Sequence, residues 1–98
     1  MLSEVLSQNP NDAFARYGLA MEYFQAGEVE QALEEFRKLL ATHPDYTAGY
    51  FMAAQTLSRA DRTAEARTML EQGIAAAQRS GNPHARSEME AMLADLAE

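Results

Sequence analysis

Apolar residues recur along most of the chain at spacings of three and four, and polar or charged residues fill the positions between them. This spacing places side chains on one face of a helix with about 3.6 residues per turn. Short segments that contain glycine, proline or aspartate interrupt the apolar stripes. The pattern predicts a short helix over 2–8 and longer helices over 12–26, 28–42, 46–60, 62–80 and 84–97.

The chain also aligns with itself at an offset of 34 residues, which places Pro10 on Pro44 and Phe36 on Leu70. A period of this length is typical of proteins built from repeated helical hairpins. The alignment predicts a single domain over 1–98, with a half-unit at 2–8, two complete hairpins and the first half of a third as a cap. The proline expected at Gln78 stands at Pro83 instead. We therefore expect the helix before it to run about a turn and a half longer.

The junctions inside the two hairpins carry residues suited to helix ends. Gly27 is able to take the left-handed conformation just past a helix, and Asp61 is expected to cap the helix over 62–80. Small residues stand where the paired helices should cross, which lets the backbones approach closely. These residues are Ala20, Ala32, Ala54 and Ala66.

Taken together, these positions resemble the tetratricopeptide repeat family over almost the whole chain. The first copy matches through Leu19, Ala20, Tyr23, Gly27, Ala32, Phe36 and Pro44, and the second through Tyr50, Ala54, Leu57, Ala66, Leu70 and Gly73. The chain departs from the family pattern at Arg16, where an aromatic residue is usual, at Asp61, where the turn glycine is usual, and at Leu39, where a small residue is usual. The resemblance implies an all-α fold, a right-handed superhelical stack of antiparallel helix pairs, whose concave face commonly holds peptides or partner helices.

A second apolar line on the first hairpin suggests where such a partner binds. Phe14, Tyr17, Met21 and Phe24 recur about 130° around the helix from its packing stripe. By the resemblance, the partner-binding groove comprises Phe14, Tyr17, Met21, Phe24, Gln25, Phe51, Gln55, Ser58 and Arg59. We expect this groove to be aromatic and nearly uncharged, with Tyr17 and Met21 exposed. Phe14 and Phe24 either line the groove or complete the core.

Composition narrows the possible partners. The chain has 15 acidic and 8 basic residues, for a net charge of −7, and this balance argues against nucleic acid. No apolar stretch approaches the roughly 20 residues needed to span a bilayer, and no secretory leader is evident, so the cytoplasm is the expected location. The acidic side chains Glu88, Glu90, Asp95 and Glu98 are expected on the outer side of the last helix.

The residue types offer little for catalysis. There is no cysteine, and the two histidines, His43 and His84, stand beside prolines at predicted helix junctions, where solvated side chains are expected. Glu34 and Glu35 are expected on an outer helix face, screened by neighbouring basic residues. No phosphate-binding glycine loop, metal-ligand cluster or cofactor motif is present in the sequence. We therefore predict a non-enzymatic protein with no cofactor.

Two functions of the groove fit these observations. In the first, it binds a peptide or helical segment of another protein, where aromatic and methionine side chains suit an apolar anchor. In the second, the same surface closes a homodimer, which would cover an exposed aromatic patch and compensate for the small number of repeats.

Overall fold

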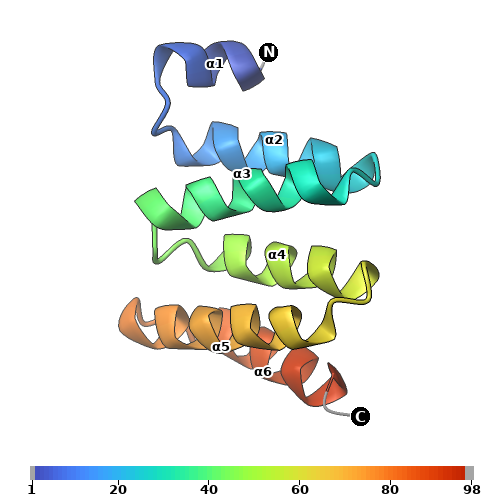
Figure 1. Cartoon of the computed structure of the whole chain (residues 1–98). Coiled ribbons are helices and arrows are strands. Elements are labelled where there is room, and N and C mark those ends of the chain that lie inside the picture. The colour runs from blue at the N-terminus through green and yellow to red at the C-terminus, as the bar shows by residue number, and fades with distance from the viewer. Residues whose placement is uncertain (1, 97–98) are drawn as a thin grey trace.

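The computed structural model describes residues 2–96 and shows a stack of helices that runs from one end of the chain to the other (Figure 1). The helices of this described part are α1 (Leu2–Gln8), α2 (Ala13–Gln25), α3 (Val29–Thr42), α4 (Thr47–Arg59), α5 (Thr63–Arg79) and α6 (Pro83–Leu96). Their bounds differ from the predicted ranges by at most one residue, except that the predicted end of the last helix at 97 lies outside the described residues.

Neighbouring helices pack in chain order. In Figure 1, α2 and α3 form one antiparallel pair and α4 and α5 form the next, while α6 lies against α5. The short α1 contacts α2 at the other end of the stack. The described helices therefore form an all-α solenoid, as the sequence pattern predicts.

Three of the helix junctions share one turn geometry. The residues Gly27, Asp61 and Gly81 have φ angles of 77°, 59° and 66°. In each case the next residue's amide donates a hydrogen bond to a carbonyl five residues earlier, at 2.8–2.9 Å. This pattern satisfies carbonyl groups that a helix end would otherwise leave open. Asp61 thus takes the role of the turn glycine, and the expectation that it caps α5 is wrong, because Arg62 precedes the helix and makes no side-chain cap.

The second hairpin ends with a longer helix, although by less than expected. Helix α5 has 17 residues and α3 has 14, a difference of three residues, or just under one turn. The expected extension of a turn and a half is wrong because the turn at Gly81 takes up the remaining inserted residues.

The core consists of small and large side chains that alternate between the helices. Ala20, Ala32 and Ala53 are fully buried beside Phe36. At Gly73, an added Cβ atom would lie 2.6 Å from the Cβ atom of Tyr50. Helix α5 can therefore approach α4 this closely only because residue 73 has no side chain.

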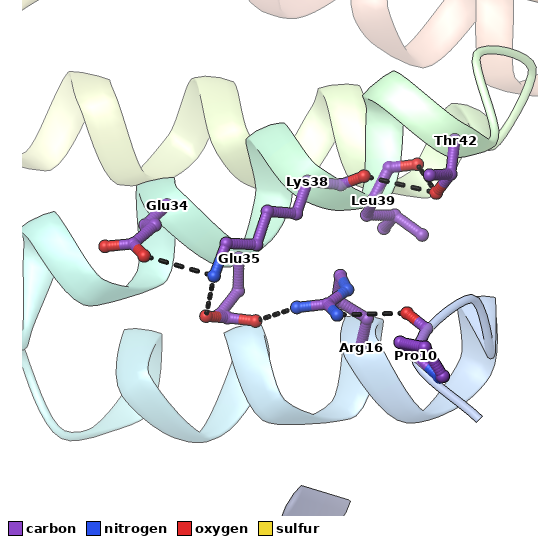
Figure 2. A network of polar contacts seen from close by, with 7 residues as sticks. All are labelled: Pro10, Arg16, Glu34, Glu35, Lys38, Leu39 and Thr42. Carbon is purple, nitrogen blue, oxygen red and sulfur yellow. Dashed lines mark hydrogen bonds and ion pairs between the residues drawn. The ribbon is translucent and has the colours of Figure 1, made fainter. Parts of the chain in front are cut away.

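An ion pair replaces one of the usual aromatic contacts of the core (Figure 2). Arg16 Nη1 lies 2.5 Å from Glu35 Oε1, and Arg16 Nη2 donates to the Pro10 carbonyl at 3.0 Å. Lys38 Nζ lies 3.7 Å from Glu35 and 3.1 Å from the exposed Glu34. The Glu35 residue is only 9% exposed, so its expected place on an outer face is wrong. A buried carboxylate needs a charged partner, and Arg16 of α2 provides one for Glu35 of α3. The ion pair therefore connects the two helices.

Candidate protein-binding groove

The first helices of the two hairpins and the last helix border a hollow of about 220 Å³. Its lining is Tyr17 from α2, Thr47, Ala48, Phe51 and Met52 from α4, Asn82 from the turn, and His84, Ala85, Glu88 and Met89 from α6. Two of the predicted groove residues, Tyr17 and Phe51, lie here. We call this lining the α6 hollow.

Tyr17 is held by other aromatic rings. Its ring centre lies 6.3 Å from that of Phe36, edge to face, and 5.4 Å from that of Tyr46. Burial raises the pKa of the Tyr17 phenol, and the nearby Tyr46 raises it further. Burial also raises the pKa of Tyr46. The ring is therefore a fixed wall of the α6 hollow, since its neighbours restrict its rotation.

The expected order of exposure along the aromatic line is wrong. Tyr17 and Met21 are partly buried, because both pack against the cluster around Ala20 and Phe36. Phe14 instead is 78% exposed and belongs neither to the core nor to a hollow that the structure shows. The first turn of α2 therefore presents an aromatic side chain to solvent.

Phe24 lies at the other end of the predicted groove. It is partly buried, and the guanidinium carbon of Arg59 stands 4.4 Å from its ring centre. These two side chains, with Gly27, Val29 and Thr56, line a second hollow of about 240 Å³. A guanidinium over an aromatic face is attracted by the ring's quadrupole, which holds Arg59 in place. We call this lining the Arg59 hollow.

The remaining predicted groove residues line neither hollow. Gln25 is exposed, and Gln55 and Ser58 are partly buried along α4. The α6 hollow takes in the beginning of α4 and the Arg59 hollow takes in its end. The structure thus divides the predicted groove into two hollows at opposite ends of α4.

The contribution of α6 to the groove is not foreseen in the sequence pattern. Glu88, expected on the outer side of this helix, lines the α6 hollow. His84 lies in the first turn of α6 rather than in a loop, and its Nε2 atom is 3.5 Å from Glu88. Asn82 accepts a hydrogen bond from the Ala85 amide at 3.1 Å and so caps α6. Gly81 is the sequence feature from which the contribution of α6 could have been predicted, because it ends α5 in the same way as Gly27 ends α2.

A wider hollow of about 320 Å³ lies on the side of α5 and α3. Its charged residues, Arg37 and Glu65, lie 4.0 Å from each other.

Among the described residues, no helix is long and apolar enough to cross a membrane. Within residues 2–96, no group of three or more acidic or histidine side chains is placed to hold a metal ion.

Comparison with known proteins agrees with this architecture. A family model described as "Tetratricopeptide repeat" matches residues 1–45 and 23–96. The chain belongs to the tetratricopeptide repeat family. A repeat-containing protein of Pseudomonas aeruginosa is 33% identical over 95 residues, which cover 97% of this chain and 90% of that protein. Membership in this family and the all-α class, both predicted from the sequence, are confirmed.

Two solved structures are similar to this fold over most of the chain. The solution structure of a tetratricopeptide repeat domain protein from Salinibacter ruber has a TM-score of 0.84 and 33% identity, and covers 90% of this chain and 89% of that one. A protein from Bordetella parapertussis has a TM-score of 0.84 and 29% identity, covering 98% of this chain and 84% of that one. Proteins of this family generally mediate protein–protein interaction and are typically non-catalytic.

Proposed function

We propose that this chain is a non-catalytic module that binds a peptide or helical segment of another protein in the groove between α2, α4 and α6. The observation that carries the proposal is the α6 hollow. Its walls include the partly exposed side chains of Tyr17, Phe51 and Met52, which provide aromatic and thioether surface for an apolar anchor.

The size of the α6 hollow favours a side chain over a small molecule. Its volume of about 220 Å³ lies below the roughly 300–1,000 Å³ of most small-molecule sites. A partner segment would insert one anchor side chain here and continue along α4. The ring of Tyr17 is already fixed by its neighbours, so binding would cost little side-chain conformational entropy at this residue.

Homo-oligomerisation through the same surface is the second candidate. Phe14, at 78% exposure, is the observation that favours it. Aromatic side chains are enriched at the contacts between subunits. Light scattering on the purified chain up to high concentration decides this candidate, because a strict monomer would remove it.

The binding proposal is tested by filling the α6 hollow with a neutral side chain. Ala48 is exposed and lines the hollow, so Ala48→Gln adds volume there without disturbing the core. The matched control is Ala75→Gln, because Ala75 is an exposed residue of α5 with the same change in helix propensity. Tyr17 is a poorer target, since replacing it would also remove packing against Phe36.

The probe is a displayed library of random 12-residue peptides selected on the wild-type chain. We expect selected peptides to bind the Ala48→Gln variant at least about tenfold more weakly, a loss of about 1.4 kcal/mol, by isothermal titration calorimetry. The Ala75→Gln variant should bind them as the wild type does. Equal binding to both variants would show that the α6 hollow is not the site.

A further inference from the structure

Two charged side chains at opposite ends of the groove have no partner of opposite fixed charge. Glu88 contacts His84 at 3.5 Å, but no lysine or arginine of residues 2–96 forms an ion pair with it. Arg59 forms no ion pair with any carboxylate of the described chain, although Arg62, Arg79 and Arg86 each do. The groove therefore has a negative end at α6 and a positive end at Arg59.

Because these charges are unmatched among residues 2–96, they indicate the chemistry of the segment that the groove accepts. Resting on the proposed function, we infer that the groove binds a bipolar segment of a partner protein. Its lysine or arginine enters the α6 hollow, and its acidic side chain or terminal carboxylate meets Arg59.

The α6 hollow suits an anchor side chain that is apolar along its stem and cationic at its end. Tyr17 and Phe51 line the hollow, and aromatic rings attract a cation that lies over their faces. Met52 provides apolar surface for the aliphatic stem that lysine and arginine carry below the charge. Glu88 provides the carboxylate for the charged end, and a net charge of −7 steers basic segments toward the chain.

The Arg59 hollow supplies the opposite charge. The stacking of the guanidinium on Phe24 at 4.4 Å fixes its plane and leaves its N–H groups without a carboxylate. A planar guanidinium binds a carboxylate through two parallel hydrogen bonds. An acidic group of the partner is therefore the ligand that this end fits.

The length of α4 sets the spacing of the two charges. Phe51 in the first hollow and Arg59 in the second are eight residues apart on one helix, or about 12 Å along its axis. An extended segment spans this distance with about four residues, and a helical segment with about eight. We thus expect a basic and an acidic residue at one of these two spacings, with apolar residues between them.

A second copy of the chain is a less suitable occupant. Two facing grooves would bring hollow against hollow and leave unfilled space between them, whereas stable interfaces are closely packed. An antiparallel pair of copies would nevertheless place Glu88 of one opposite Arg59 of the other. The oligomeric state is therefore measured in the same experiment.

The test reverses each charge and repeats the selection from the random 12-residue peptide library. Glu88→Lys is compared with Glu90→Lys, since both glutamates lie on α6 and their side chains are 52% and 49% exposed. Glu90 forms an ion pair with Arg86 at 3.1 Å, so its variant also measures what the loss of a surface ion pair on α6 does to binding. Glu90 does not line either hollow. Arg59→Glu is compared with Arg67→Glu, an exposed residue of α5 that lines neither hollow.

On the wild type we expect selected peptides to carry a basic and an acidic residue at one of the two spacings. Such peptides should bind Glu88→Lys and Arg59→Glu about fivefold to tenfold more weakly, and the control variants within about twofold. Selection on Glu88→Lys should replace the basic residue with an acidic one.

Three results would overturn the inference. If selected peptides show no charge preference but still lose binding to Ala48→Gln, the proposed function stands and the bipolar segment is wrong. If no selected peptide binds the Ala48→Gln variant more weakly than the wild type, the proposed function fails as well. If light scattering shows a dimer that Glu88→Lys dissociates, the occupant is a second copy.

Discussion

The ion pair between α2 and α3 provides a quantitative test of how this repeat is held together. Replacing Glu35 with alanine leaves Arg16 with only the Pro10 carbonyl, at 3.0 Å, as a partner. Removing one member of a fully buried ion pair costs about 3–5 kcal/mol. The side chains of Arg16 and Glu35 remain 15% and 12% exposed. Because solvent can partly compensate the remaining charge, we expect Glu35→Ala to lower the free energy of unfolding by about 2–3 kcal/mol.

The neighbouring Glu34 is the matched control, because it lies in the same helix and also forms an ion pair with Lys38. Its side chain is 65% exposed, so Glu34→Ala should cost only about 0.3–0.5 kcal/mol. Urea unfolding followed by circular dichroism gives both values, and the melting temperature of Glu35→Ala should fall by roughly 10–20 °C. A difference of less than about 0.5 kcal/mol between the two variants would refute this interpretation of the pair.

The same reasoning predicts that a paired replacement is tolerated. Substituting Arg16→Met and Glu35→Leu together removes both charges and restores an apolar contact between α2 and α3. Such replacements of buried pairs are often neutral or stabilising. We expect the free energy of unfolding of the double variant to lie within about 1 kcal/mol of the wild-type value, or above it. If the double variant is destabilised as much as Glu35→Ala, the loss of stability arises from lost side-chain packing rather than from an unpaired charge.

Three further predictions concern the backbone and the tyrosines. Gly73→Ala should destabilise the chain by about 1–3 kcal/mol because its Cβ atom would overlap α4. Gly18→Ala should be close to neutral, because its Cβ atom would meet only the end of the Leu2 side chain, at 2.9 Å; urea unfolding that ranks the two variants in the reverse order would contradict this. Asp61→Gly should stabilise by about 0.5 kcal/mol by relieving a left-handed conformation, and no gain in the same assay would count against it. Burial raises the pKa values of Tyr17 and Tyr46 above 10.0, so their stabilising contribution is present below pH 10 and is lost at higher pH, where the unfolded phenols ionise first. The melting temperature of Tyr17→Phe should therefore fall less steeply with alkaline pH than that of the wild type.

The helices and the family were predictable because they depend on local patterns. Apolar spacing locates helices, and Gly27 marks a turn that the structure shows at a φ of 77°. The 34-residue offset aligns small and large core residues such as Ala20 and Phe36, both fully buried. The apolar spacing is visible within one helix, and the offset is visible when two copies of the repeat are aligned, so no knowledge of distant contacts was needed.

The surface of the groove was harder to predict because it depends on how separate helices meet. The partial burial of Tyr17 depends on Tyr46, which precedes a different helix, whereas no neighbouring helix covers Phe14, which is 78% exposed. Glu35 is buried because Arg16, 19 residues earlier, reaches it. Glu88 lines a hollow because α6 packs beside α4 after the turn at Gly81. A helix pattern specifies which residues share a face, but the neighbouring helix decides whether that face is covered.

We propose that partners bind between α2, α4 and α6. Titrating a selected 12-residue peptide into the ¹⁵N-labelled chain, and following the amide resonances by NMR, tests it most directly. We predict that the largest shifts occur at residues of the α6 hollow, including Tyr17, Ala48 and Phe51. Largest shifts on the opposite side of the stack, around Thr68 of α5, would contradict the account.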